Sequence, residues 1–305
     1  MYKKYIYLGV IKTRKFNIGF LVVLTSFTIY TLLDTFVLEN SYSNVKKSSS
    51  ITQTSTKSSG EITKNETSYE DDNIKIELKT YEEYNTKIYV ADITLSDASF
   101  LKTALAKNSY GKNVKENTST IASNNNAILA INGDFYGAQE RGYVLRNGVI
   151  YRNTARSNQE DLVIYEDGSF EIIKEEDVSL ESLLEKGAYN VLSFGPALIE
   201  NYNISVTKND EVGKSMASNP RTLIGMIDDL HYVFIVSDGR TSESEGLSLY
   251  ELATFAQKLN IRTAYNLDGG GSSTMYFNGK VINNPTTSGR NISERSVSDI
   301  VYIGY

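Results

Sequence analysis

An apolar stretch near the amino terminus is the longest feature of the hydrophobic pattern. Residues 16–38 read FNIGFLVVLTSFTIYTLLDTFVL, and a helix of this length crosses the hydrocarbon core of a bilayer. Its one charged residue, Asp34, lies near the end, where a carboxylate costs less than at the bilayer centre. The sequence therefore predicts a transmembrane signal anchor over residues 16–38.

The charges before this stretch predict its orientation. Residues 1–15 carry Lys3, Lys4, Lys12, Arg14 and Lys15, so the positive-inside rule makes them a cytoplasmic tail. The rest of the chain is then extracellular, held at the cell membrane by one span. No Ala-x-Ala cleavage pattern follows, which favours an uncleaved anchor. Late cleavage is the alternative, and it would release the same domain.

The next segment, residues 39–72, is rich in Ser, Thr, Lys and Asn and includes SSSITQTSTKSSGE. It lacks apolar periodicity and cannot bury enough surface to offset chain entropy. We predict a disordered stalk there and one globular domain over residues 73–305.

Apolar positions within the domain alternate in short runs typical of strands. Predicted strands cover residues 74–79, 87–95, 127–131, 143–146, 149–152, 162–165, 170–173, 221–227, 232–237, 263–267, 274–277, 280–282 and 297–303. Asn147-Gly148 and Asn278-Gly279 predict tight hairpins. Helical spacing or capping residues predict helices at 97–107, 118–125, 179–186 and 247–259. Strands and helices do not alternate strictly, so the fold class is α+β, with mixed β-sheets and flanking helices.

Composition narrows the chemistry. The chain of 305 residues has no Cys, one His and a net charge of −6. Thiol catalysis, disulfides and His-rich metal sites are excluded, and the acidity argues against nucleic-acid binding. The single histidine, His231, begins a predicted strand with no nucleophile-elbow motif nearby, so we interpret it as structural.

Three predicted strands end in an aspartate beside glycine: INGDFYG with Asp134, VSDGR with Asp238 and NLDGGGSS with Asp268. Glycine beside a rigid strand end lets backbone N–H groups approach a ligand. Each Asp-Gly alone is an ordinary turn, but three of them in one domain favour a site. Carboxylates are the usual proton-transfer and nucleophilic groups of glycosidic cleavage.

The glycine-rich segment can bind an anion. Successive N–H groups over Gly269–Ser273, with two hydroxyls, would form an anion nest; a plain lead-in to a hairpin is the alternative. A nucleotide phosphate loop is excluded because no Gly-Lys-Ser/Thr follows. Arg221 and Arg240 are candidate phosphate ligands, although either could be a solvated surface charge.

Seven segments together resemble the phosphodiester glycosidase family. They occur from residue 127 to the carboxyl terminus and read INGDFYG, RNGVIY, SFGPALIENY, NPRTLIG, VSDGR, NLDGGGSSTM and ERSVSDIVYI. The resemblance implies hydrolysis of the bond between a sugar's anomeric carbon and a phosphodiester oxygen. It also implies that one cleft gathers Asn132, Asp134, Arg221, Asp238, Arg240, Asp268, Gly269, Gly270, Ser272 and Ser273.

We therefore expect an extracytoplasmic hydrolase acting on carbohydrate phosphates, such as exopolysaccharide or teichoic-type polymers of the cell surface. Asp268 is the expected nucleophile or base, with Asp134 or Asp238 as its partner. Arg221, Arg240 and the residues Asn132, Gly269, Gly270, Gly271, Ser272 and Ser273 would bind the phosphate. Two other classes stay open: a noncatalytic module that binds anionic glycans, and a scaffold for polysaccharide assembly. Clustered aspartates could instead hold Ca²⁺ or Mg²⁺, which prefer oxygen ligands.

Overall fold

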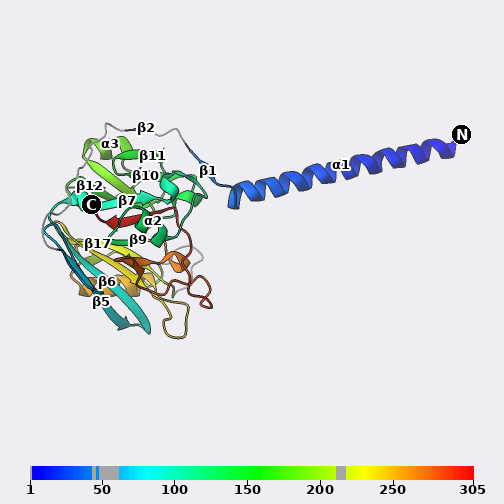
Figure 1. Cartoon of the computed structure of the whole chain (residues 1–305). Coiled ribbons are helices and arrows are strands. Elements are labelled where there is room, and N and C mark those ends of the chain that lie inside the picture. Colours follow the sequence, from blue (N-terminus) through cyan, green and yellow to red (C-terminus); the bar gives the residue numbers. More distant parts are fainter. Residues whose placement is uncertain (1, 43–45, 48–61, 211–217) are drawn as a thin grey trace.

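A long helix projects from a sheet-rich domain in the computed structural model (Figure 1), which describes residues 2–42, 46–47, 62–210 and 218–305. The helix, α1, spans Tyr2–Phe36. Its 22 residues from Lys15 to Phe36 are apolar enough to cross a membrane, and none of that window is buried against the domain. The helix coincides with the predicted anchor, although it begins earlier in the chain.

The largest sheet has nine strands in the order β16-β15-β19-β17-β18-β6-β5-β4-β3. In chain order these strands are Thr63–Lys64 (β3), Ser68–Glu70 (β4), Ile74–Glu83 (β5), Thr86–Leu95 (β6), Ala197–Glu200 (β15), Asn203–Ile204 (β16), Thr222–Asp228 (β17), His231–Ser237 (β18) and Thr263–Leu267 (β19). Its centre is the β17-β18-β6 run, where almost every side chain is buried. At the edge of this centre, His231 Nε2 lies 2.7 Å from Asp92 Oδ1, which agrees with a structural role for the histidine.

Two smaller sheets complete the domain. One has the order β21-β20-β9-β22-β7, and the other β13-β12-β14-β10-β11-β2. The five strands of the first are Leu101–Leu105 (β7), Leu129–Asn132 (β9), Met275–Phe277 (β20), Lys280–Val281 (β21) and Asp299–Ile303 (β22). The six of the second are Lys46–Lys47 (β2), Gly142–Arg146 (β10), Val149–Thr154 (β11), Glu160–Tyr165 (β12), Phe170–Lys174 (β13) and Ala188–Leu192 (β14). A separate pair joins β1 (Asn40–Ser41) to β8 (Gly111–Lys112).

One hydrophobic core lies between the three sheets. It joins Phe234 of β18 and Ile76 of β5 to Ile131 of β9 and Leu162 of β12, all fully buried. Because the sheets share this core, the ends of β9, β19 and β22 are held at fixed positions relative to one another.

Short helices cover the outer faces of the sheets. The α4 helix (Leu249–Lys258) packs with the nine-stranded sheet, and α2 (Thr118–Asn124) packs with the five-stranded sheet. The third, α3 (Leu180–Glu185), covers the six-stranded sheet and begins at Ser179, whose side chain accepts a hydrogen bond from Ser182 N. The remaining described helices are 3-10 turns at Ala98–Phe100, Ala106–Asn108, Tyr136–Ala138 and Gly270–Ser272.

The expected α+β class is confirmed, with two refinements. Every strand ladder among the described residues is antiparallel, where we expected mixed sheets. The helix predicted at 97–107 is wrong. Asp97 caps only the turn Ala98–Phe100, and Leu101–Leu105 then pairs with β22 because that register buries Leu101 and Leu105.

The prediction of a disordered stalk over residues 39–72 is wrong for the strand residues that the structure describes in this range. Asn40–Ser41 pairs with β8, Lys46–Lys47 pairs with β11, and Thr63–Lys64 and Ser68–Glu70 belong to the nine-stranded sheet. The domain sheet therefore begins before residue 73. Residues 43–45 and 48–61 of the predicted stalk lie outside the described residues.

Replacing Ser248 by alanine tests the start of α4. The Ser248 side chain accepts a hydrogen bond from Glu251 N, and the Glu251 side chain accepts one from Ser248 N. We expect Ser248→Ala to lower the free energy of unfolding by about 1 kcal/mol and Tm by about 2–4 °C. Far-UV circular dichroism of the full chain in detergent measures this. The exposed Ser157→Ala is the control, and an equal Tm for the two variants would contradict the capping role.

Candidate active site

Asn132 fastens the strand ends on which the site is built. It ends β9 and is fully buried. Its Nδ2 donates to the Asp268 carbonyl at 2.6 Å, while its Oδ1 accepts from Thr222 Oγ1 at 2.8 Å and from Thr274 N at 3.2 Å. The backbone N–H of Asp268 also donates to the Gly133 carbonyl. Asn132 therefore holds the loop after β9 against the loop after β19.

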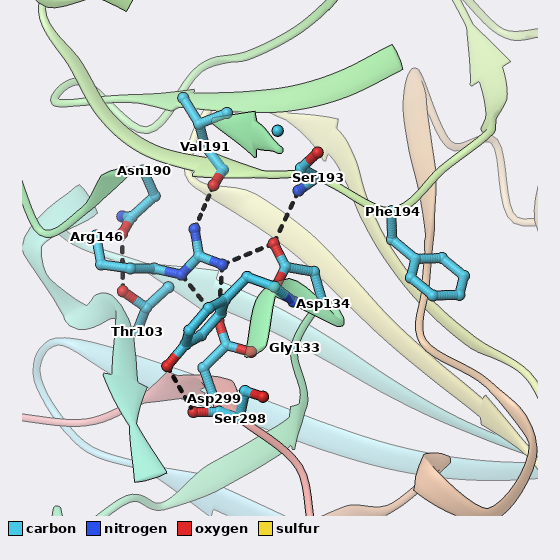
Figure 2. Close-up of polar contacts among 12 residues, drawn as sticks. Thr103, Gly133, Asp134, Arg146, Asn190, Val191, Ser193, Phe194, Ser298 and Asp299 are labelled. Atoms are coloured by element: carbon cyan, nitrogen blue, oxygen red, sulfur yellow. Dashed lines mark hydrogen bonds and ion pairs between the residues drawn. The ribbon is translucent and has the colours of Figure 1, made fainter. Parts of the chain in front are cut away.

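A buried guanidinium lies behind these loops (Figure 2). Arg146, at the end of β10, is 2% exposed. Its Nη2 donates to Asp134 Oδ2 at 2.7 Å, its Nε donates to Asp299 Oδ2 at 2.8 Å, and its Nη1 donates to the Val191 carbonyl. One residue thus ties the loop after β9 to β22 and β14.

Asp134 is held on all sides by this arrangement. Its Oδ1 accepts from Tyr136 N at 2.9 Å, and its Oδ2 accepts from Arg146 and from Ser193 N at 2.8 Å. Its side chain has no exposed surface. A carboxylate with these partners is suited to positioning the loop and poorly suited to proton transfer.

The electrostatics of the cluster follow from two carboxylates sharing one cation. Burial raises the pKa of Asp299, against the lowering effect of Arg146, and the neighbouring Asp134 raises it further. The two carboxylates hold the Arg146 pKa above its usual range although burial opposes this. Gly133 leaves room for the cluster, because a Cβ there would lie 2.3 Å from Asp299 Oδ1.

Asp268 faces a cavity, which Asp134 also borders although the Asp134 side chain has no exposed surface. The cavity has a volume of about 250 Å³, and its lining includes Asp268, Ser272, Arg295 and the backbone turn at Phe135. Arg295 Nη2 lies 3.1 Å from Asp268 Oδ2, and Arg295 Nε donates to Ser272 Oγ at 2.9 Å. The Arg295 side chain is 40% exposed, so part of it is available to a ligand.

The environment of Asp268 changes its titration. Burial raises the pKa of the Asp268 carboxyl, although Arg295 and the Ser272 hydroxyl oppose the shift by stabilising the charged form. A carboxylate with a raised pKa at a cavity wall is a candidate general base.

Arg240 lies near Arg295 on the other side of the glycine-rich loop. Burial, and then the positive charge of Arg295, lower the pKa of Arg240. Its Nη2 donates to Asn219 Oδ1 at 2.9 Å and its Nη1 to the Thr287 carbonyl at 2.6 Å. Gly270 has φ of +62°, and a Cβ there would lie 2.8 Å from Arg240 Nη2. The glycine therefore leaves room for the guanidinium next to the loop.

The loop itself is not an open nest of N–H groups. Gly270 N donates to the Pro220 carbonyl, Ser272 N to Gly269 and Ser273 N to Gly270. The amides of Gly269 and Gly271 are the remaining candidates of the five, and Gly269 N already favours the charged Asp268 carboxylate. The Ser273 hydroxyl is fully buried. The loop therefore shapes the site chiefly through Ser272.

Asp238 and Arg221 lie apart from this cavity. Asp238 accepts hydrogen bonds from Tyr89 Oη and from Asn284 N and Nδ2, and it lines a separate cavity of about 270 Å³. Arg221 is 3% exposed, and its Nε donates to the Leu247 carbonyl. The structure thus brings Asp134 and Asp268 to one cavity. Asp238 lines a different cavity, and Arg221 is buried against Gly269 without lining the Asp268 cavity.

Three residues of the site were not singled out from the sequence: Arg295, Arg146 and Asp299. Arg146 ends β10 beside the Asn147-Gly148 turn, Asp299 begins β22, and Arg295 lies in the irregular segment before β22. The sequence around them does not distinguish a buried or site-lining charge from a surface charge.

The residues present do not fit a metal cage. Among the described residues, no group of three or more His, Asp or Glu is placed to hold a metal ion. Asp134 and Asp268 are each paired with an arginine, which supplies the positive charge that a cation would bring. We derive no catalytic step through Ca²⁺ or Mg²⁺.

Fold and site together define an antiparallel α+β domain with a carboxylate and arginines at one cavity. The sequence model of the phosphodiester glycosidase family matches residues 125–304. The chain belongs to the phosphodiester glycosidase family.

Individual relatives are distant. The uncharacterized SPbeta prophage-derived protein YomE of Bacillus subtilis is 27% identical over 64% of this chain and 31% of its own length. The human N-acetylglucosamine-1-phosphodiester alpha-N-acetylglucosaminidase is 41% identical over 22% of this chain and 13% of its own. This chain therefore spans less than a third of either relative.

Solved structures share the fold. The zebrafish N-acetylglucosamine-1-phosphodiester alpha-N-acetylglucosaminidase catalytic domain, auto-inhibited by its pro-peptide, superposes with a TM-score of 0.60 at 19% identity, covering 76% of this chain and 83% of that one. A hypothetical protein from Synechocystis gives 0.53 at 14% identity, covering 76% of this chain and 62% of that one.

Replacing Arg146 by methionine tests the buried cluster. The change leaves Asp134 and Asp299 without their cation, so we expect a loss of about 3–5 kcal/mol in the free energy of unfolding. Unpaired buried carboxyls have raised pKa values, so the deficit should grow as the pH rises from 5 to 7.5. Chemical unfolding of the full chain in detergent at both pH values measures it.

The control is the triple variant Asp134→Asn, Arg146→Met, Asp299→Asn, which removes all three charges. We expect it to recover much of the loss and to lose the pH dependence. A deficit in Arg146→Met that is equal at both pH values would contradict the electrostatic origin.

Proposed function

We propose that this chain is a membrane-anchored extracytoplasmic hydrolase that cleaves the bond between a sugar anomeric carbon and a phosphodiester oxygen. The observation that carries the proposal is Asp268, a carboxylate with a raised pKa that lines a cavity beside Arg295 and Ser272. Family membership supplies the reaction class, and the apolar α1 helix supplies the anchor.

In the proposed reaction Asp268 takes a proton from water as the water oxygen attacks the anomeric carbon. The bond from that carbon to the phosphate oxygen breaks, and its electron pair stays on the phosphate. The products are a free sugar and a phosphomonoester. The departing phosphate is weakly basic, so the site needs no carboxylic acid to protonate it.

A single displacement fits the carboxylates better than a double one. A retaining glycosidase uses one carboxylate as nucleophile and a second as acid and base. Asp134 accepts three hydrogen bonds and has no exposed surface, and Asp238 lines another cavity. Asp268 is then the one carboxylate of the three that can contact the reacting atoms, as a base.

Two guanidiniums would stabilise the phosphate. Arg295 lines the cavity, and Arg240 lies close enough for their charges to interact. Guanidinium groups match the oxygens of a phosphate, and preorganised charge is most effective where charge develops in the transition state. Arg295 thus replaces Arg221 of the sequence prediction as the second phosphate ligand.

Cell-surface polymers are the proposed substrates, with exopolysaccharide and teichoic-type chains as candidates. The named relatives act on N-acetylglucosamine-1-phosphodiesters, so that sugar is the first probe. Positive charge in residues 1–15 supports a cytoplasmic amino terminus and an extracellular domain.

Replacing Asp268 by asparagine tests the catalytic assignment. The amide keeps the shape of the side chain but cannot accept a proton, so we expect kcat to fall about 10²–10⁴-fold with KM little changed. The assay follows release of N-acetylglucosamine from a methyl N-acetylglucosamine-1-phosphodiester by the full chain in detergent. The exposed Asp177→Asn is the matched control. Undiminished turnover in Asp268→Asn would refute the assignment; binding without turnover by the wild type would favour the glycan-binding module.

The pH dependence gives an independent test. A base must be ionised to act, so kcat/KM should fall as the pH drops through the Asp268 pKa. Because burial raises that pKa, we expect kcat/KM to fall at a pH above the ordinary carboxyl pKa of about 3.9. A fall at the ordinary value, measured from pH 3.5 to 8, would show that Asp268 is not the group that titrates.

A further inference from the structure

A second and larger cavity adjoins that of Asp268. Its volume is about 1140 Å³, and the two cavities have lining residues in common, including Asn113, Lys115, Phe135 and Gly137. These shared residues place the two cavities next to each other, and the Asp268 cavity is the smaller of the two. A single sugar phosphate in the Asp268 cavity would leave the larger cavity unfilled.

The larger cavity is basic in a protein whose net charge is negative. Lys112, Lys115, Arg141, Arg152 and Arg156 line it, against one acidic residue, Glu140. Arg152 has a structural role, since its Nε and Nη1 donate hydrogen bonds to backbone carbonyls of the domain. No ion pair among the described residues joins the other four to a carboxylate. These charges would attract an anionic ligand.

Tyrosines form one wall of the same cavity. Tyr110 lies between Tyr136 and Tyr151, with ring centroids 5.3 Å and 5.1 Å apart, and the Tyr110 and Tyr136 rings are stacked. Tyr136 is buried, so the aromatic surface of this wall that a ligand can reach belongs to the partly exposed Tyr110 and Tyr151. An aromatic side chain offers apolar surface beside a polar edge, which suits a sugar ring. Basic and aromatic side chains together therefore favour a glycan that carries phosphate groups.

The rim of the cavity lies at the end of α1. Thr35 and Phe36 contribute to its lining. Asn113 Nδ2 donates to the Thr35 carbonyl at 3.1 Å and to the Leu38 carbonyl at 3.2 Å, and Asn40–Ser41 pairs with β8. The apolar window ends at Phe36, so a membrane crossed by α1 would end close to residues that line the cavity. Figure 1 shows this end of α1 next to the domain, near β1.

From these features we infer that the larger cavity is a binding site for the phosphate-bearing portion of a membrane-attached glycan. The terminal sugar phosphodiester of the same glycan enters the Asp268 cavity. The inference rests on the proposed function, and it adds that the substrate has several phosphates and is held in the membrane that holds α1.

The test compares three probes on the full chain reconstituted in neutral phosphatidylcholine vesicles. They are methyl N-acetylglucosamine-1-phosphodiester, a soluble trimer of N-acetylglucosamine-1-phosphate repeats, and the same trimer joined to a lipid in the vesicles. The variant is Arg141→Gln, Arg156→Gln, two exposed residues that line only the larger cavity. Lys75→Gln, Lys79→Gln removes the same charge from β5, away from both cavities, and is the matched control.

We expect the wild type to cleave the lipid-linked trimer best and the methyl compound least. The Arg141→Gln, Arg156→Gln variant should lose about tenfold or more in kcat/KM on the trimers through KM, with unchanged turnover of the methyl compound. Equal losses on all three probes, or none on the trimers, would overturn the binding site. Equal cleavage of the two trimers would overturn membrane attachment of the substrate. A defect that appears only when anionic lipid is added would assign the arginines to lipid headgroups and overturn the inference.

Failure of the proposed function is distinguishable from failure of this inference. If the wild type releases no sugar from any probe, yet the reconstituted protein binds the soluble trimer in a manner that depends on Arg141 and Arg156, the hydrolase is removed and the glycan site is retained. Release of sugar from the methyl compound, with no preference for the trimers, would retain the hydrolase and remove the glycan site.

Discussion

One buried guanidinium fixes the geometry of the site. Arg146 donates to Asp134, Asp299 and the Val191 carbonyl, which belong to three different strand ends. Taking such charges out of water is costly unless every one is paired, so the cluster forms only when these strands reach their places. The loop after β9 is thereby held still, and Asn132 transmits its position to Asp268 through a hydrogen bond of 2.6 Å.

The three aspartates consequently differ in what they can do. The carboxylate of Asp134 accepts hydrogen bonds from Arg146 and Ser193, and that of Asp238 accepts them from neighbouring residues such as Asn284. Asp268, in contrast, faces a cavity. Arg295 and Ser272 hold Asp268 without covering it. Rigid support behind one accessible carboxylate is the arrangement that a positioned base requires. The two fully bonded aspartates supply the rigidity.

Local patterns predicted most of the secondary structure but not its assembly. The Asn147-Gly148 hairpin and the capped α4 helix follow from chemistry within a few residues, and both are present. The segment after Asp97 shows the limit. Its residues are compatible with a helix, yet pairing with β22, almost two hundred residues away in the chain, makes Leu101–Leu105 a strand. Tertiary pairing of this kind leaves no trace in a short window.

The candidate site was predictable to the level of the loops and not of the individual roles. Asp134, Asp238 and Asp268 all follow strands and lie beside glycine, so their local sequences predict the same role for all three. Only burial and partners separate them, and those depend on residues far away, such as Arg146 and Arg295. The segment between anchor and domain shows the same effect on a larger scale. Its polar composition predicts a flexible stalk, but Asn40–Ser41 pairs with β8 directly after α1. A long flexible segment directly after α1 would let the domain move freely relative to the helix, whereas this pairing holds the end of α1 at the rim of the larger cavity.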